Sequence, residues 1–199
     1  MDYIGIDIGS TASKVVVKGD HDIHFVLPTG WSSKETCQTI KDRLLEDSVD
    51  VLSDDSKVVA TGYGRVAVDF ADHVITEITC HAKGANYLNP NVRTIIDIGG
   101  QDSKVIRLSE SGAVETFAMN DKCAAGTGRF LEMMARTLQM KLPEMSELGL
   151  DWHNDVTISS MCTVFAESEV VSLIARSTAP ADIIHGLNKS VAGKTAALA

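Results

Sequence analysis

IDIGSTASKVVV (residues 6–17) recurs ninety positions later in the chain as IDIGGQDSKVIR (residues 96–107). Seven of the twelve positions are identical, and they include Asp7 and Asp97, each of which precedes a glycine-centred turn. In each copy an apolar run ends in the aspartate, the turn follows, and a second apolar run begins. This pattern predicts a β-hairpin with an acidic residue at the end of its first strand.

The segments that follow the two hairpins also correspond. Their periodicity predicts a third strand, then helices and strands in similar order, with Ser32 or Ser33 as the N-cap of the first helix. Two βββαβα units indicate a duplicated α/β protein with a cleft between its halves, divided near residues 89–91, where Pro90 interrupts a helix pattern. In the first half the main predicted elements are strand 22–28, helix 32–47, a short strand within 56–64 that ends in a glycine-rich loop, a short helix, strand 73–79 and helix 80–88. In the second half they are strand 113–120, helix 128–140, strand 155–160, helix 162–176 and helix 180–199.

The composition is that of a soluble protein and excludes several functions. Of 199 residues, 44% are hydrophobic and 23% charged, and no apolar run has the length of a membrane helix or the pattern of a signal peptide. The net charge of −9 argues against a nucleic-acid surface, which needs clustered Lys and Arg. Four widely separated cysteines are interpreted as reduced thiols or ligands in a cytoplasmic protein rather than as disulfides.

The two glycine turns have the composition of phosphate-binding loops. Gly9 and Gly99 permit tight turns in which backbone N–H groups approach a ligand closely, and Lys14 adds a positive charge. Hydroxyl donors are supplied by Ser10, Thr11 and Ser13. Together these groups are suited to the β- and γ-phosphates of a nucleotide.

The aspartates suit a metal ion. Asp7 and Asp97 are expected to face each other across the cleft, where they would hold a hydrated Mg²⁺ and orient an attacking water, with Gln101 within reach of that water. The alternative is a pair of ordinary hairpins in which Asp and Ser stabilise the turns locally. Two matched copies favour phosphate binding.

With these paired hairpins the chain resembles the superfamily of acetate kinase, sugar kinases, heat-shock protein 70 and actin. Within it, nearly all 199 residues resemble the ATP-dependent activators of 2-hydroxyacyl-CoA dehydratases and benzoyl-CoA reductases. The stretches that carry this resemblance are GIDIGSTASK, ATGYGR, EITCHAKGA, IDIGGQDSK, MNDKCAAGTGRFLE and SSMCTVFAESEVVS.

The resemblance implies a fold of two ribonuclease-H-like (actin-like ATPase) domains, at residues 1–90 and 91–199, with a nucleotide cleft between them. Members of the superfamily bind adenine with a later segment, a strand that ends in a Gly-Gly loop and is followed by a helix. This segment is not found here, so we expect the second domain to be truncated at its C-terminus, with weaker nucleotide binding.

The resemblance also implies an activity. The family's activator is a homodimer that holds one [4Fe–4S] cluster on its two-fold axis, and ATP hydrolysis drives a low-potential electron onto an acyl-CoA dehydratase or reductase. A ferredoxin or flavodoxin would be the upstream donor, under anaerobic conditions, and no membrane or nucleic acid takes part. The alternatives are a cluster-free small-molecule kinase of the same superfamily and an inactive nucleotide-binding fragment.

Residue by residue, the resemblance assigns Cys123 and Cys162 as cluster ligands. It assigns Asp7 and Asp97 to Mg²⁺ and hydrolysis, together with Gln101. The nucleotide contacts it implies for ATP or ADP are Gly9, Ser10, Thr11, Ala12, Ser13, Lys14, Gly99, Gly100, Gln101 and Lys104.

Each of the two ligand cysteines precedes a predicted helix, for which Thr127 and Thr163 are candidate N-caps. The positive helix ends are expected to point at the cluster and to supply N–H donors to its sulfurs. Since a [4Fe–4S] cluster usually takes four thiolates, two per chain predict a symmetric dimer. The alternatives for Cys123 are a buried small residue or a nucleophile, although no nearby His forms a base pair with it. The remaining cysteines, Cys37 and Cys80, are interpreted as non-ligands.

Overall fold

The computed structural model describes residues 1–159 and 162–199. These residues divide into two compact units. The first contains Met1–Val92 and Ser109–Val114, and the second contains Arg93–Leu108 and Glu115–Ala199. The chain therefore passes between the units three times, after residues 92, 108 and 114. No helix in the described part of the chain has both the length and the apolar character needed to cross a membrane.

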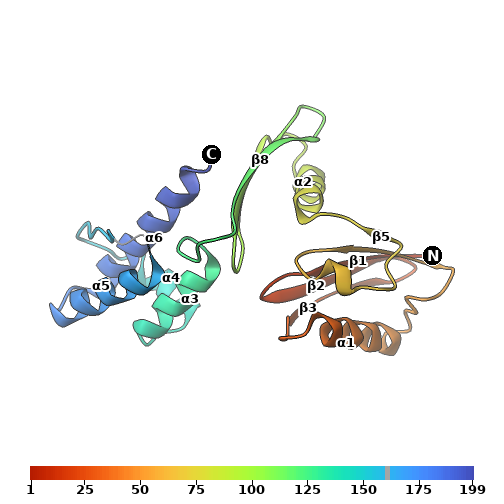
Figure 1. Ribbon diagram of the computed structural model, residues 1–199, viewed down its shortest axis with the longest axis horizontal. Helices are drawn as coiled ribbons and strands as arrows, with labels where there is room; N and C mark the ends of the chain where they lie inside the picture. Colours follow the sequence, from red (N-terminus) through yellow and green to blue (C-terminus); the bar gives the residue numbers. More distant parts are fainter. Residues whose placement is uncertain (160–161) are drawn as a thin grey trace. The chain divides into compact units, whose positions relative to one another are not determined.

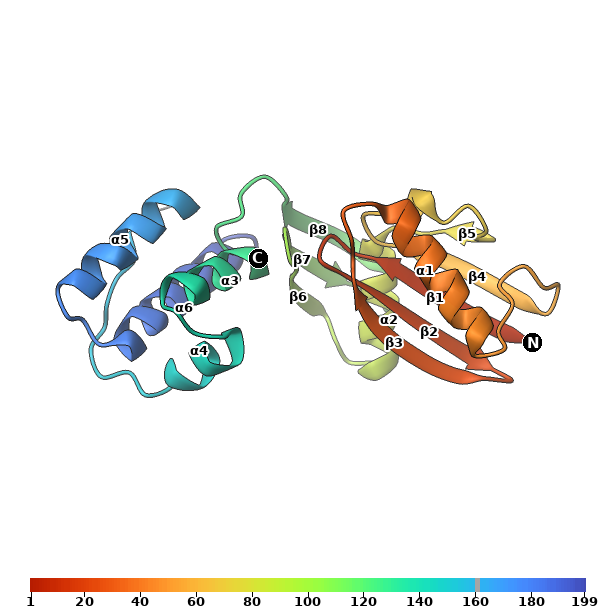
Figure 2. The same ribbon diagram turned by 90° about the horizontal axis from the view of Figure 1, so that it is seen from below.

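The first unit (Figure 1) contains a five-stranded sheet, and Figure 2 shows its strands in the order β3-β2-β1-β4-β5. Strand β1 pairs antiparallel with β2 and parallel with β4, and β2 pairs antiparallel with β3. The elements are β1 (Asp2–Ile8), β2 (Ala12–Gly19), β3 (Asp22–Pro28), α1 (Ser33–Glu46), β4 (Ser56–Thr61), η1 (Arg65–Ala67), β5 (His73–Val74) and α2 (Glu77–Leu88). The first predicted hairpin is thus confirmed.

The core of the first unit lies between one face of this sheet and α1, which runs along it in Figure 2. Alternate residues of β1 point into this core, so Ile4, Ile6 and Ile8 are buried and pack in one cluster with Ile40 and Leu44 of the helix. The helix begins where the sequence predicts, because the Ser32 hydroxyl accepts a hydrogen bond from the Glu35 N–H at 3.3 Å. This two-layer packing leaves the opposite face of β1, with Asp7, outside the core.

The predicted strand at 73–79 is mostly wrong. Only His73 and Val74 form β5, and α2 begins at Glu77 rather than at residue 80. Thr76 is the N-cap of this helix, and its hydroxyl accepts a hydrogen bond from the Thr79 N–H at 3.5 Å. A threonine cap therefore outweighs the β-branched run that favours a strand.

The second unit contains the three-stranded sheet β6-β7-β8, in which β6 and β7 form the second predicted hairpin. Its helices enclose a separate core around Phe130, Met134, Ile184 and Leu187. The elements are β6 (Thr94–Ile98), β7 (Ser103–Leu108), β8 (Val114–Asn120), α3 (Gly128–Thr137), α4 (Leu142–Leu148), α5 (Thr163–Ala175) and α6 (Pro180–Ala196). Helix α4 was not predicted.

The predicted strand at 155–160 does not form in residues 155–159, and residue 160 lies outside the described part of the chain. This segment packs on α6, where Gly186 lies so close to the Val156 carbonyl that a Cβ would be 2.5 Å from its oxygen. The Asp182 carboxylate accepts the backbone N–H groups of residues 153 and 154 at 2.8 and 2.9 Å, and Glu169 accepts that of Ser159 at 3.1 Å. Side chains, rather than a neighbouring strand, therefore bind this backbone.

Candidate functional site

The first hairpin pairs the predicted catalytic aspartate with the predicted phosphate-binding lysine. Asp7 lies directly opposite Lys14 in the β1–β2 register, and the lysine Nζ donates to Asp7 Oδ2 at 3.0 Å. Both side chains are partly exposed. Thr11 is exposed and Ser10 is half-buried in the turn between the strands, next to Gly9. The structure therefore brings the predicted carboxylate, cation and glycine turn together at one end of the sheet.

Ser13 and Ala12 differ from the other predicted contacts of this hairpin. Ala12 is half-buried at the start of β2, and Ser13 is fully buried on the face that points to α1. The Ser13 hydroxyl lies 2.7 Å from the hydroxyl of Thr29 and is hydrogen-bonded to it. Ser13 is therefore not on the same face as Lys14, and the structure does not bring its hydroxyl to the exposed turn.

Strand β4 adds two residues that the sequence reasoning did not single out, although both belong to the quoted ATGYGR stretch. Thr61 lies beside Asp7 in the parallel β1–β4 register, and its Oγ1 is buried with no hydrogen-bond partner. Gly62 follows with a φ of +86° and packs so closely that a Cβ would overlap Asp7 Oδ1 and lie 2.5 Å from the Ile8 carbonyl oxygen. The Asp7 carboxylate can occupy this position only because residue 62 is a glycine and has no Cβ.

The second hairpin repeats the acidic–basic pair in a more buried form. Lys104 is 4% exposed and its Nζ lies 3.3 Å from Asp97 Oδ2 and 2.8 Å from Asp102 Oδ2. Burial alone would lower the pKa of Lys104, but its hydrogen bonds and ion pairs with Asp102 and Asp97 outweigh burial, so the pKa is raised. Gln101 is exposed in the turn, after Gly100. Lys104 is therefore held as a fixed, charged partner of two carboxylates.

The turn of the second hairpin is hydrogen-bonded to the first turn of α3. The Gly128 N–H donates to the Gly99 carbonyl at 2.8 Å, and the Arg129 N–H donates to the Gly100 carbonyl at 3.0 Å. These are N–H groups that a helix start leaves unpaired. The sequence analysis expected the N–H groups at the start of this helix to point at a cluster. For Gly128 and Arg129 this expectation is wrong, because carbonyl groups of the hairpin turn accept their hydrogen bonds.

The loop that carries Cys123 precedes this helix. The Asn120 side chain accepts the Cys123 N–H at 3.2 Å and donates to the Cys123 carbonyl at 3.0 Å, which fixes the main chain there. Thr127 is the N-cap of α3 by position, but its hydroxyl donates to the Ala124 carbonyl at 2.7 Å instead of accepting from the helix. For α5 the predicted N-cap Thr163 is wrong, since Cys162 itself occupies the N-cap position.

The four cysteines fall into two groups. Cys123 and Cys162 are exposed and belong to the second unit, whereas Cys37 is buried in the first unit and Cys80 is half-buried there on α2. Burial, together with the negative charge of Asp69, raises the pKa of the Cys37 thiol, which disfavours a thiolate ligand.

The two exposed thiols are the candidate cluster ligands of this chain. In residues 1–159 and 162–199, no group of three or more His, Cys, Asp or Glu side chains is placed to hold a metal ion. Two exposed thiols per chain are half of the four that a [4Fe–4S] cluster takes, so in number they suit a cluster bound by two chains.

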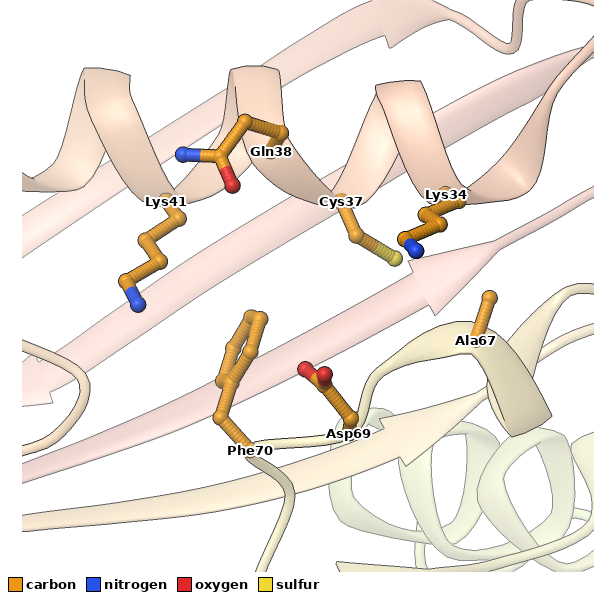
Figure 3. A pocket seen from close by; sticks show the side chains of 7 residues that line it. All are labelled: Lys34, Cys37, Gln38, Lys41, Ala67, Asp69 and Phe70. Atoms are coloured by element: carbon orange, nitrogen blue, oxygen red, sulfur yellow. The ribbon is translucent and has the colours of Figure 1, made fainter.

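A separate cavity of about 310 Å³ lies beside α1 in the first unit. Figure 3 shows Asp69 and Phe70 opposite the helix, with the Cys37 sulfur pointing into the space between. It contains none of the predicted site residues. Its lining residues are Lys34, Cys37, Gln38, Lys41, Ala67, Asp69 and Phe70.

Together with its family and structure matches, the duplicated strand–turn–strand unit with an Asp–Lys pair in each copy assigns the protein to the ATPases of the actin-like fold. Comparison with known proteins then places it within this class. The chain belongs to the BadF/BadG/BcrA/BcrD ATPase family, whose pattern matches residues 4–199.

Three relatives are close in sequence or structure. The activator of lactoyl-CoA dehydratase from Anaerotignum propionicum is 50% identical over 199 residues, which cover 98% of this chain and 76% of that protein. The crystal structure of (R)-2-hydroxyglutaryl-CoA dehydratase component A from Acidaminococcus fermentans matches with a TM-score of 0.89 at 43% identity, over all of this chain and 77% of that one. The activator of 2-hydroxyisocaproyl-CoA dehydratase from Clostridium difficile, with bound ADPNP, matches with a TM-score of 0.89 at 42% identity, over all of this chain and 75% of that one.

Proposed function

We propose that this protein is an ATP-dependent activator that donates electrons to an acyl-CoA dehydratase or to a reductase of the benzoyl-CoA type. The observation that carries the proposal is the pair of exposed cysteines, Cys123 and Cys162, in the same unit as the second Asp–Lys hairpin. Two exposed thiols, one in the loop before α3 and one at the N-cap of α5, can serve as cluster ligands, whereas phosphoryl transfer by a kinase requires no thiol. The activator names of the relatives and their high identity support the same conclusion.

In this proposal the glycine turns bind the phosphates of ATP. Backbone N–H groups of the turns and the Lys14 ammonium would neutralise the phosphate oxygens, and Gln101 would orient the attacking water. Asp7 and Asp97 would hold a hydrated Mg²⁺, as hard carboxylate oxygens do. The domain assignment, residues 1–90 and 91–199, belongs to this proposal, and so does nucleotide binding by both domains.

The thiolates of Cys123 and Cys162 would hold half of a [4Fe–4S] cluster, and the same residues of a second copy would hold the other half. When bound, the cluster supplies one-electron transfer at low potential. The second unit then contributes the thiolates and the Asn120 hydrogen bonds that fix the Cys123 main chain. The proposal includes a ferredoxin or flavodoxin as donor, anaerobic operation and the cytoplasm, where thiols stay reduced.

Anaerobic reconstitution with iron and sulfide tests this assignment. We expect about four irons per dimer and an EPR signal after reduction. Cys123→Ser and Cys162→Ser should each lose the bound iron, while Cys37→Ser and Cys80→Ser, which change the cysteines outside the second unit, should keep it. Retention of the cluster by both ligand variants would sink the ligand assignment. An iron-free protein that phosphorylates a small acid or sugar would support the kinase alternative.

A further inference from the structure

A side-chain hydrogen bond joins the second hairpin to residues 121–127, the loop between β8 and α3 that carries Cys123 (the cysteine loop). The two main-chain bonds described above join the same hairpin to the first turn of α3. Ser103 begins β7 and is 2% exposed, and its hydroxyl donates to the Gly126 carbonyl at 2.7 Å. The equivalent residue of the first hairpin, Ser13, instead bonds to the Thr29 hydroxyl. The repeat therefore uses the same buried serine for a different partner in its second copy, and that partner lies in the cysteine loop.

The loop between this bond and the cysteine is short and internally fixed. Gly126 is buried with a φ of +105°, a conformation that glycine favours, and it is three residues from Cys123. The Thr127 hydroxyl bonds back to the Ala124 carbonyl, and the Asn120 side chain holds both main-chain polar groups of the cysteine. A shift of the Gly126 carbonyl therefore changes the placement of the whole loop.

On the hairpin side of the Ser103–Gly126 hydrogen bond, Ser103 lies next to charged residues and the turn packs closely against α3. Ser103 is adjacent in sequence to Asp102 and Lys104, whose side chains form an ion pair at 2.8 Å. A Cβ on Gly128 would lie 3.2 Å from the Gly99 carbonyl oxygen, so the helix start rests directly on the glycine turn. A phosphate bound at this turn would move or fix the groups to which the cysteine loop is attached.

We propose that Ser103 is a positioning residue that couples nucleotide occupancy of the 99–102 turn to the conformation of the Cys123 loop. The coupling rests on the proposed function, because it requires that the turn binds nucleotide phosphate. It acts within the second unit, through the Ser103–Gly126 hydrogen bond and the main-chain bonds to α3. A purely structural serine would stabilise the hairpin but would transmit no nucleotide effect to the cysteine.

The test measures the alkylation rate of Cys123 in the cluster-free protein under anaerobic conditions. Iodoacetamide labelling is followed by peptide mass spectrometry with no nucleotide, with Mg-ADP and with Mg-ADPNP. In the wild type we expect nucleotide to change the Cys123 rate about threefold, the effect of roughly one hydrogen bond on an equilibrium. Ser103→Ala should reduce this to less than about 1.5-fold while the nucleotide Kd changes less than about twofold. Ser103→Thr, which keeps the hydroxyl, should restore the effect.

Ser56→Ala is a matched control. Ser56 is 6% exposed, and its hydroxyl donates to the backbone carbonyl of Asp50 at 2.7 Å, in the first unit and outside the cysteine loop. This variant loses a similar buried hydrogen bond and should retain the full nucleotide effect on Cys123. Loss of that effect in Ser56→Ala as well as in Ser103→Ala would overturn the proposal, because general destabilisation would then explain both.

Hydrogen exchange in the wild type gives a second measurement that needs no variant. Nucleotide should change the protection of the Gly128 and Arg129 amides together with the alkylation of Cys123. Nucleotide binding that leaves both readouts unchanged, or a full effect in Ser103→Ala, overturns the coupling and leaves the proposed function standing. A wild-type chain that binds no nucleotide in calorimetry overturns both proposals.

Discussion

Gly62→Ala is expected to destabilise the first unit and to displace Asp7. The φ of +86° at Gly62 lies in the region that L-residues avoid, and a Cβ there would lie 2.5 Å from the Ile8 carbonyl oxygen and overlap the Asp7 carboxylate. The Ile8 carbonyl cannot move easily, since it also accepts the Gly64 N–H at 2.8 Å. Backbone strain and steric overlap therefore act at the same position.

The magnitude follows from these two terms. The left-handed backbone costs about 1–2 kcal/mol for a residue with a Cβ, and overpacking against fixed neighbours costs about 1–3 kcal/mol. We expect a loss of about 3 kcal/mol in the free energy of unfolding, which at about 2 kcal/mol/M lowers the urea midpoint by roughly 1.5 M. ATP hydrolysis should fall as well, because Asp7 is displaced.

Gly84→Ala is the matched control in the same unit. Gly84 lies within α2, and an added Cβ would meet no atom within 4 Å. Alanine in a helix interior is favoured by about 0.5–1 kcal/mol, so this variant should be more stable than the wild type. Urea unfolding followed by circular dichroism measures both. A Gly62→Ala midpoint equal to that of the wild type would refute the steric argument, as would equal shifts for the two variants.

Three further expectations concern charge and thiol chemistry. Lys104→Met should lower the free energy of unfolding by about 2–3 kcal/mol, less than the loss of a fully buried ion pair, because the aspartate partners of Lys104 are about a quarter exposed. Lys14 is half-exposed, so Lys14→Met should lower the free energy of unfolding by less than about 1 kcal/mol. Equal losses for the two variants in urea unfolding would contradict this. Hydrogen bonds from two backbone N–H groups lower the pKa of Asp182 from 3.8 to about 2, so its contribution is complete above about pH 4 and lost as the pH falls towards 2. The stabilities of the wild type and Asp182→Asn should converge over that range, and a constant difference would be evidence against this. Iodoacetamide should label Cys37 more slowly than Cys123, because burial raises the pKa of the Cys37 thiol; peptide mass spectrometry showing faster labelling of Cys37 would overturn this.

Much of the fold could be predicted from local signals. The two hairpins follow from the repeat, and the first helix follows from its serine cap and apolar spacing. The strand predicted at 155–160 failed because Val156 and Ile158 have the alternation of a strand, while the groups that bind this backbone, Asp182 and Glu169, lie ten or more residues further along the chain, on helices. Pairing partners at such separations leave no mark on the local pattern.

The candidate site shows the same division. The repeat placed each aspartate and its lysine in one hairpin, but the sequence analysis assigned them to Mg²⁺ and phosphate and did not predict their ion pairs, which follow from opposite positions in the strand register. The contact between the Gly99 turn and Gly128 could not be anticipated, because it joins main-chain atoms whose only trace in the sequence is glycine. Glycine has many other uses, so residue type alone does not reveal which backbones meet.

The three passages of the chain between the units bear on how this protein is made. Residues 109–114 belong to the first unit, where a Cβ on Gly112 would lie 2.5 Å from the Asn86 side chain on α2. A ribosome must therefore release more than half of the chain, through residue 114 of 199, before the first unit has all of its parts. If the gene were split after residue 92, the first fragment would lack residues 109–114 and its unit would be incomplete. We expect a split protein to assemble only if its first fragment extends through the β7–β8 turn.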